Sequence, residues 1–371
     1  MPTVRDLIQA INHKYPLARA AAWDKVGLQI GDAEGSVASV LVAHEVTAAT
    51  LDAASGHDAL VVYHPLLFRP LDNLDYSNHT VRLTGRCITL GLHLIAVHTA
   101  LDHAPQPFAL GDHLAHSLGL HNVEILAPSG HESLWKIAVF TPPEAVDTVS
   151  AALWDAGAGH IGCYDQTSFR TRGTGTFRAL PGADPYSGEI GKREDADEWR
   201  LEVIVPLAQR DAAVRALIAA HPYEEVAYDV YALHNKGAAY GAARRGQPGE
   251  TPVLLDDFAR TVQERLNAPA VRVVHPVGAT KINTVRRVAC VPGSGASYLG
   301  AIAQAGCDCL VTGDIKHHDA LQAQALGVAL VDATHTATER AAVDLMADAL
   351  SGVPDVTIER CRIDTNPFAT L

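Results

Sequence analysis

The chain has 371 residues, of which 48% are hydrophobic, and it carries a formal net charge of −13. The composition is ordinary for a globular protein, and the length suits two domains. The acidic balance argues against general binding to nucleic acid, which requires clustered Lys and Arg. No apolar run approaches the ~20 residues needed to cross a bilayer, and the N-terminal segment lacks a signal-peptide core. We therefore expect a cytoplasmic protein with no membrane or nucleic-acid partner.

The N-terminal third alternates helical and strand patterns. Apolar residues with helical spacing alternate with short runs rich in Val, Ile and Leu. This rhythm predicts a parallel sheet covered by helices. The expected helices are 3–13, 47–55 and roughly 78–91, and the expected strands are 39–44, 59–62 and 93–97.

The middle of the chain has a different order of elements. A strand and a helix are followed by short strand-like stretches and by a polar Gly/Pro/Asp loop over 181–197. A further strand, helix and strand complete the region, which predicts a ferredoxin-like α+β module. The expected strands are 133–140, 199–206 and 225–233, and the expected helices are 144–157 and 207–221.

From about residue 250 the α/β rhythm returns, with strands near 286–291, 307–313 and 328–333 and helices between them. We therefore predict an α/β fold in which one three-layer domain with a parallel-rich sheet is split into residues 1–129 and 241–371. Residues 130–240 are predicted to form an inserted ferredoxin-like α+β domain. The Gly/Ala/Arg-rich stretch 235–250 is interpreted as the linker that returns from the insertion.

Polar side chains gather just after the predicted strands of the α/β part. In an open parallel sheet, ligands bind outside the carboxyl ends of the strands. Carboxylates and imidazoles buried together are unfavourable unless a cation compensates them, which predicts a bound divalent metal. The strand-end residues are His44, Glu45, Tyr63, His64, His98, Asp102, Asp314, Lys316, His317, His318, Asp332, His335 and Glu339.

Each of these residues also has a simpler interpretation. His335 and Glu339 share a helix face, but such pairs are mostly solvated surface. A histidine such as His64 is usually a hydrogen-bonded core residue, and Asp102 could cap a helix. The Gly/Ser loop 291–302 could hold an anion on its N–H groups, although a tight packing turn is the more common explanation. The joint placement of the polar residues is what favours a metal site.

Seven ordered motifs, spread over nearly the whole chain, carry a family resemblance. The motifs are WDKVGLQIGD (23–32), YHPLLF (63–68), HTALD (98–102), HPYEE (221–225), GSGASY (293–298), TGDIKHHDA (312–320) and HTATE (335–339). Together they resemble the NIF-three-like proteins, often labelled GTP cyclohydrolase 1 type 2. The resemblance implies a split α/β domain, a PII/CutA-like insertion, a two-metal site and a ring-shaped homohexamer.

The resemblance also implies a set of metal ligands. They are His64, Asp102, His335 and the bridging carboxylate of Glu339. Tyr63 stands where the family has the first histidine of a His-His-Pro motif, so we expect the second metal position to be weakened. By ligand type the site suits one or two divalent ions per chain, from Zn, Fe, Mn, Co and Ni.

Two functions remain open from the sequence. The first is a hydrolase that uses a metal-activated water on a nucleotide or related small molecule. In it Glu339 and His98 would move protons, and Lys316, Gly293 and Gly295 would hold phosphates. The alternative is a non-catalytic metal-binding protein with a regulatory or metal-delivery role. A purely structural metal ranks last, because structural zinc sites prefer closed Cys/His coordination.

Overall fold

The computed structural model describes residues 1–277 and 284–369 of the chain. The chain divides into two compact units, which are called here the split unit (residues 1–130 and 240–371) and the inserted unit (residues 131–239). No helix in the described ranges is long and apolar enough to cross a membrane.

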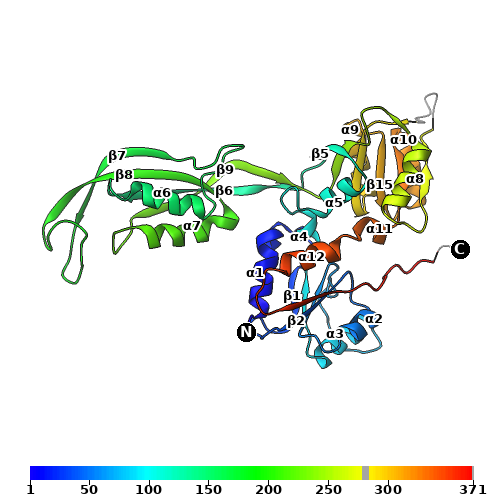
Figure 1. Ribbon diagram of the computed structural model, residues 1–371, viewed down its shortest axis with the longest axis horizontal. Coiled ribbons are helices and arrows are strands. Elements are labelled where there is room, and N and C mark those ends of the chain that lie inside the picture. Colours follow the sequence, from blue (N-terminus) through cyan, green and yellow to red (C-terminus); the bar gives the residue numbers. More distant parts are fainter. Residues whose placement is uncertain (278–283, 370–371) are drawn as a thin grey trace. The chain divides into compact units, whose positions relative to one another are not determined.

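The first sheet of the split unit has five strands, in the order β1-β4-β3-β2-β17 (Figure 1). Four of them run parallel, and β1 pairs with β4 in the antiparallel sense. The central strands are short runs of Val, Leu, Ile and Ala with almost no exposed surface, as expected for a sheet covered on both faces. The strands are β1 (Gly27–Ile30), β2 (Ser39–Ala43), β3 (Ala59–Val62), β4 (His93–Ala96) and β17 (Thr357–Arg360).

Helices cover both faces of this first sheet. On one face α1 (Val4–Lys14) and α12 (Ala342–Leu350) pack into one apolar cluster with the sheet, and on the other α2 (Ala48–Ala53) and α3 (His79–Thr89) pack into a second. Helix α1 begins at a capping box, in which Thr3 and Asp6 satisfy each other's backbone N–H groups.

The second sheet of the split unit has six strands, in the order β12-β16-β15-β14-β10-β5. Its centre is the parallel trio β14, β15 and β16, and the flanking pairings are antiparallel. The strands are β5 (His121–Ile125), β10 (Arg244–Gln247), β12 (Arg272–Val274), β14 (Val288–Ser294), β15 (Cys309–Gly313) and β16 (Ala329–Asp332). The covering helices are α5 (Leu110–Ser117) and α8 (Leu255–Arg265) on one face, with α9 (Leu299–Gln304) and α10 (His317–Leu326) on the other.

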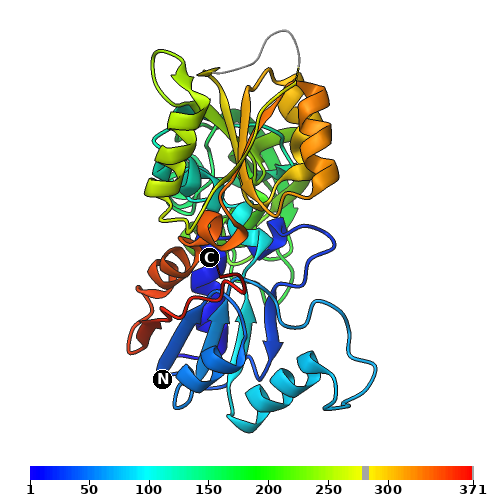
Figure 2. The same cartoon turned by 90° about the vertical axis from the view of Figure 1, so that its right-hand side faces the viewer.

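The prediction of a single parallel-rich sheet is therefore wrong, because the strands of the split unit form two large sheets (Figure 2). A further two-stranded sheet pairs β11 (Val253–Leu254) with β13 (Thr284–Val285). Each large sheet has helices on both faces and thus its own pair of apolar clusters. The linker predicted over 235–250 is also wrong in part. That stretch contains the end of β9 and the whole of β10, which pairs with β5 and β14.

The inserted unit has one antiparallel sheet of four strands, in the order β7-β8-β6-β9. Two helices pack on one face of the sheet and share its apolar core (Figure 1). The elements are β6 (Gly130–Thr141), α6 (Val146–Asp155), β7 (Phe169–Arg178), β8 (Arg193–Pro206), α7 (Leu207–Ala220) and β9 (Tyr228–Tyr240). The loop predicted over 181–197 is shorter, because residues from Arg193 onward pair with β7.

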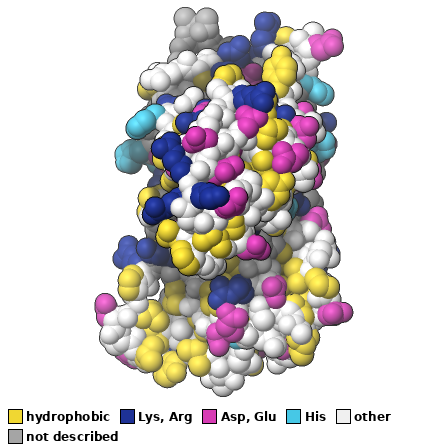
Figure 3. Space-filling model, turned by 90° about the vertical axis from the view of Figure 1, so that its left-hand side faces the viewer, with side chains coloured by type: hydrophobic (Ala, Val, Ile, Leu, Met, Phe, Trp, Pro, Cys, Tyr) yellow, Lys and Arg dark blue, Asp and Glu magenta, His cyan; other side chains and the backbone are white. Residues whose placement is uncertain are grey.

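Charged side chains of both signs are intermingled on the face drawn in Figure 3. The inserted unit contains exposed ion pairs, such as Arg172 with Asp197 and Lys192 with Glu189. This face shows neither a continuous basic patch nor a continuous acidic one. Exposed pairs of this kind contribute little to stability.

One ion pair of the split unit is buried. The side chain of Arg244 in β10 has no exposed surface, and its guanidinium donates through Nε and Nη2 to the carboxylate of Asp112 in α5. The Nη2–Oδ2 distance is 3.0 Å, and Nη1 donates to the carbonyl oxygen of Gly241. The pair thus ties a strand of the second sheet to a covering helix.

Replacing Arg244 with Met should lower the free energy of unfolding by about 3–5 kcal/mol, because Asp112 would stay buried without its cation. The neighbouring Arg245, whose partner Glu124 lies at the surface, provides the control. Arg245→Met should change the same quantity by less than about 1 kcal/mol. Urea denaturation followed by circular dichroism measures both, and equal losses in the two variants would contradict the buried pair's role.

Candidate functional site

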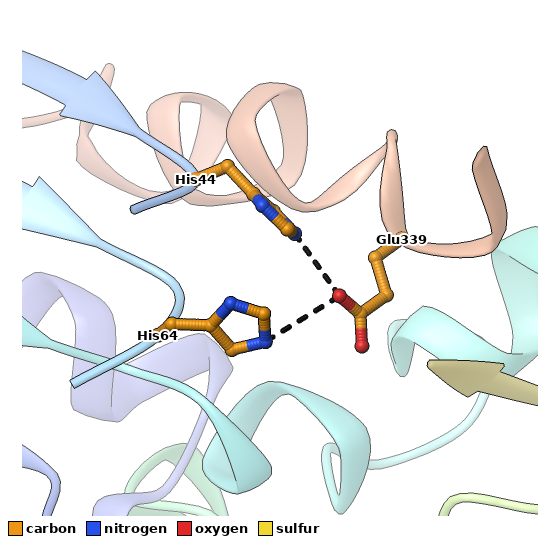
Figure 4. A group of neighbouring side chains, drawn as sticks. All are labelled: His44, His64 and Glu339. Atoms are coloured by element: carbon orange, nitrogen blue, oxygen red, sulfur yellow. Dashed lines mark hydrogen bonds and ion pairs between the residues drawn. The ribbon is translucent and has the colours of Figure 1, made fainter. Parts of the chain in front are cut away.

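Three side chains of the split unit converge where strands end. His44 follows β2, His64 follows β3, and Glu339 closes the short helix α11 (His335–Glu339), which comes after β16 of the second sheet. The His64 N–H donates to the His44 carbonyl oxygen at 3.0 Å, so the two histidines come from adjacent backbones. The ligand atoms of the three residues all lie within 4.8 Å of one another, and both imidazoles point at the carboxylate (Figure 4).

One oxygen of Glu339 is the centre of this cluster. Glu339 Oε2 lies 3.0 Å from His44 Nε2, 3.4 Å from His64 Nε2 and 2.9 Å from His335 Nε2. Ligands at ~2.0–2.2 Å from a tetrahedral ion stand ~3.3–3.6 Å from one another. The donor atoms therefore already have nearly the spacing that a coordinated ion requires.

A second carboxylate faces the far nitrogen of each imidazole. Glu45 Oε1 lies 3.3 Å from His44 Nδ1 and 3.5 Å from His64 Nδ1, and Asp314 Oδ2 lies 2.7 Å from His335 Nδ1. A carboxylate on Nδ1 fixes the ring orientation and directs Nε2 as the ligand, which is the usual arrangement around protein-bound metals. All three Nε2 atoms point toward Glu339.

Burial and charge together shift the pKa values of these groups. Burial alone would raise the pKa of Glu339, but the close imidazoles of His335, His44 and His64 lower it to about 2. Burial would lower the pKa of His44, but the Glu339 and Glu45 carboxylates raise it to about 9. Glu339 and Asp314 raise the pKa of His335 to about 9 in the same way. The positive charge near Glu339 is therefore carried by the protonated imidazoles of His44 and His335.

The donor set fits a divalent cation. Although His335 Nε2 is 2.9 Å from Glu339, its direction does not make a hydrogen bond, and this buried nitrogen has no hydrogen-bond partner among the described residues. A buried polar atom without a partner is unfavourable, and a metal ion in place of the imidazole protons would satisfy it. Imidazole nitrogen and carboxylate oxygen suit zinc and the neighbouring transition metals.

Gly293 makes room for this arrangement. Its φ is +64°, and a Cβ at this position would lie 2.3 Å from Glu339 Oε1, so a larger residue would displace the carboxylate. The N–H groups of Gly293 and Gly295 donate to Thr338 Oγ1 at 2.9 Å and Thr312 Oγ1 at 2.8 Å. Phosphate binding by these two glycines stays a prediction, and their N–H groups are already engaged.

A cavity of about 680 Å³ opens beside the cluster. Two of the cluster residues, His64 and Glu339, line it together with His335. His98 and Asp102, which the sequence predicts as site residues, line the same cavity. Lys316 is exposed just before α10 and is not among the lining residues, so its contact with substrate stays a prediction.

Tyr63 is buried behind the cluster, and its hydroxyl donates to Asp102 Oδ1 at 2.9 Å. Burial and the charges of Asp102 and Glu339 raise the pKa of Tyr63 well above its usual value. Tyr63 is therefore the donor in its hydrogen bond to Asp102, and its ligation as a phenolate stays a prediction. Burial and the Glu339 charge raise the pKa of Asp102 to about 7. Asp102 as a metal ligand stays a prediction.

His98 is held by a carboxylate that the sequence analysis missed. Asp24 Oδ1 lies 2.8 Å from His98 Nδ1, while Asp24 Oδ2 accepts the Thr99 N–H at 3.1 Å. Burial would raise the pKa of Asp24, but the hydrogen bonds from His98 and Thr99 lower it to about 2. His98 itself has a positive φ of 38°, a strained conformation typical of functional positions. Asp24 thus fixes the imidazole with Nδ1 occupied.

The sequence analysis also left His44, Glu45 and Asp314 without a role at the site. All three were recognised as strand-end residues. The sequence does not show which side chains they contact, because that depends on how the neighbouring strands pair. The parallel pairing of β2 and β3 places His44 opposite Tyr63, one residue beyond the Ala43–Val62 pair, and the bond from the His64 N–H to the His44 carbonyl oxygen then brings His44 next to His64.

Metal binding should release protons, because His44 and His335 have pKa values of about 9 and must lose their protons to bind an ion. We expect about two protons per zinc ion at pH 7, so the apparent affinity should rise up to about 100-fold per pH unit below pH 9. Calorimetry in buffers of different ionisation enthalpy counts the protons. His44→Gln should remove about one of them, and zinc binding without proton release would contradict the charge assignment.

Similar proteins share this architecture along their full length. A curated protein of Bacillus subtilis (strain 168), "GTP cyclohydrolase 1 type 2 homolog", is 35% identical over 376 residues, which cover 99% of this chain and 98% of that protein. A protein of the same name from Mycobacterium tuberculosis (strain ATCC 25618 / H37Rv) is 36% identical over 374 residues, covering 98% of this chain and 96% of that protein.

A solved structure gives the same result for the fold. The crystal structure of a Bacillus cereus protein related to NIF3 has a TM-score of 0.88 and 35% identity, and the match covers 100% of this chain and 99% of that one. The family model described as Duf34/NIF3 (NGG1p interacting factor 3) matches residues 2–367. The chain belongs to the Duf34/NIF3 family.

Proposed function

We propose that the protein is a metal-dependent hydrolase acting on a nucleotide or a related small molecule. One observation carries the proposal: three imidazoles, each oriented by its own carboxylate contact, direct Nε2 at Glu339 beside an open cavity. A bound divalent ion would lower the pKa of a water molecule and polarise an oxygen of the substrate. His44, His64, His335 and Glu339 would hold the ion.

Charge and contacts separate the two candidate proton carriers, Glu339 and His98. Glu339 has a pKa of about 2, so it carries no proton near neutral pH and serves as a ligand. His98 lines the cavity and has only its Nδ1 engaged, by Asp24. Its Nε2 can therefore accept a proton from the attacking water and return it to the leaving group. Asp24 orients the ring and stabilises the imidazolium that forms.

The substrate class rests on the size of the cavity and on the relatives. A volume of about 680 Å³ suits a nucleotide-sized molecule, and Trp23 and Tyr298 offer flat rings at its wall. The relatives' name, "GTP cyclohydrolase 1 type 2 homolog", makes GTP the first substrate to test. In that reaction water attacks C8 of the guanine ring.

Purified zinc-loaded protein should convert at least one member of a panel of GTP, other nucleotides and phosphoesters, with products identified by mass spectrometry. Glu339→Gln should lose both metal and turnover. His98→Gln should keep the metal and lose turnover by about 10²–10⁴-fold, the usual contribution of a general base.

His318→Gln is the matched control, because His318 is exposed and does not line the cavity. It should leave metal content and turnover unchanged. Metal binding without turnover of any panel member would instead support the non-catalytic regulatory or metal-delivery alternative. Full turnover in His98→Gln would exclude His98 as the proton carrier.

We further propose that Tyr63 limits the site to one tightly held ion. The phenol donates to Asp102 and so occupies an oxygen that a second ion would need. Tyr63→His should raise the metal content from about one to about two ions per chain, because a neutral nitrogen replaces a phenol with pKa ~10 or above. Elemental analysis measures it, with Tyr63→Phe as the control that removes only the hydroxyl. Two ions in the unaltered protein would contradict the proposal.

Two further properties are proposed. The inserted unit is proposed to be a ferredoxin-like module, which its strand–helix–strand–strand–helix–strand order supports. A homohexamer is proposed on the family resemblance, and light scattering on the purified protein measures the mass directly.

A further inference from the structure

The inserted unit contains a cavity of its own, of about 390 Å³. It lies on the face of the sheet opposite the apolar core shared with α6 and α7, because Glu198 and Phe140 alternate with core residues such as Leu201 and Val139. The segment 183–187 and the HPYEE motif at 221–225 form its other walls. That motif has no part in the site around Glu339.

Glu198 supplies a buried negative charge to this cavity. Its side chain belongs to a residue that is only 9% exposed, and its Oε1 accepts a hydrogen bond from the Tyr223 hydroxyl at 3.2 Å. Its Oε2 has no hydrogen-bond or ion-pair partner among the described residues, and it is not one of the fully buried atoms without a partner, so this oxygen is accessible from the cavity. A ligand that brings a positive charge would therefore meet a carboxylate oxygen that no cation of the described chain occupies.

The Glu198 carboxylate occupies the space that a side chain at position 175 would fill. A Cβ on Gly175, in the neighbouring strand β7, would lie 2.0 Å from Glu198 Oε2. Burial and the charge of Glu198 raise the pKa of Tyr223, so the Tyr223 hydroxyl stays a donor. Glu198 is thus built into the wall of the cavity and does not extend into solvent.

Aromatic rings form much of the remaining wall. Phe140, Phe177, Tyr186 and Tyr223 all line the cavity, and the centroids of the two tyrosine rings are 5.5 Å apart. Aromatic faces attract cations through the negative potential above the ring. The rings therefore favour a ligand that carries both a positive charge and carbon surface.

The lining residues of this cavity that the structure describes include three glutamates and no Lys, Arg or His. The exposed Glu224 and Glu225 lie at the wall beside Glu198. Arg200 lies over the Phe140 ring at 5.8 Å, but its Nε is engaged by Glu202 Oε1 at 2.9 Å. The charge of Glu198 is therefore not neutralised by a nearby cation of the described chain.

We propose that this cavity binds a small organic ammonium ion, whose N–H groups donate to Glu198 and whose carbon chain packs on the aromatic rings. A metal ion is the poorer occupant, because the glutamates of this cavity do not form a group of closely spaced ligand atoms. In the described chain such a group is formed by His44, His64 and Glu339. A neutral apolar molecule would leave Glu198 without a cation.

Ligand-observed NMR with the full-length protein tests the proposal, with n-butylammonium as the probe and n-butanol as its neutral counterpart. The ammonium ion should bind saturably and at least tenfold more tightly than the alcohol. Glu198→Gln keeps the shape and removes the charge, and it should weaken butylammonium at least tenfold without affecting the alcohol.

Asp197→Asn is the matched control. Asp197 is the adjacent residue of β8, pairs with Arg172 at the surface and does not line the cavity. It should change the affinity less than twofold, and circular dichroism confirms that both variants fold. Absence of saturable butylammonium binding, equal binding of alcohol and ammonium, or an equal loss in the two variants would each overturn the proposal. The first two outcomes need no variant at all.

Discussion

The structure of the site depends on one electrostatic constraint, the almost complete burial of the Glu339 carboxylate. A carboxylate removed from water must be surrounded by donors or cations, and here three imidazole nitrogens provide them. Two of the imidazoles come from the first sheet, while Glu339 and the third come from a helix after the second. The two sheets of the split unit must therefore present their strand ends to a common point, and the fold of the unit satisfies that requirement.

The carboxylates of the site have two different tasks. Glu339 faces the Nε2 atoms, whereas Glu45, Asp314 and Asp24 contact Nδ1 atoms and set the orientation of each ring. The outer carboxylates keep every imidazole ready to act through its other nitrogen. The non-glycine residues His98 and Asp314 have positive φ values, so the backbone is strained where these rings are positioned.

Most elements could be predicted from the sequence because they depend on local patterns. The apolar run at 59–62 is a local signal of a buried strand, and the periodicity over 3–13 is a local signal of a helix. The division into two large sheets could not be predicted, since it depends on pairings between strands far apart in the sequence, such as β17 with β2 and β10 with β5, and no local pattern encodes these pairings. The same holds for the site. Strand-end position identified His64 and Glu339, but the role of His44 depends on strand register, which only the folded sheet defines.

The pairing of β17 with β2 has a consequence for how the protein is made. During synthesis β2 leaves the ribosome long before β17, so the edge of β2 that β17 covers has no strand partner in the interval. The inserted unit is continuous in sequence and emerges whole in the meantime, so it has every residue it needs to fold first. Glu339 also follows His44 and His64 by a long stretch of chain, and until it emerges the two histidines lack the Glu339 carboxylate. The nascent chain therefore passes through a stage with an exposed strand edge, where association with a chaperone or with another nascent copy competes with correct closure.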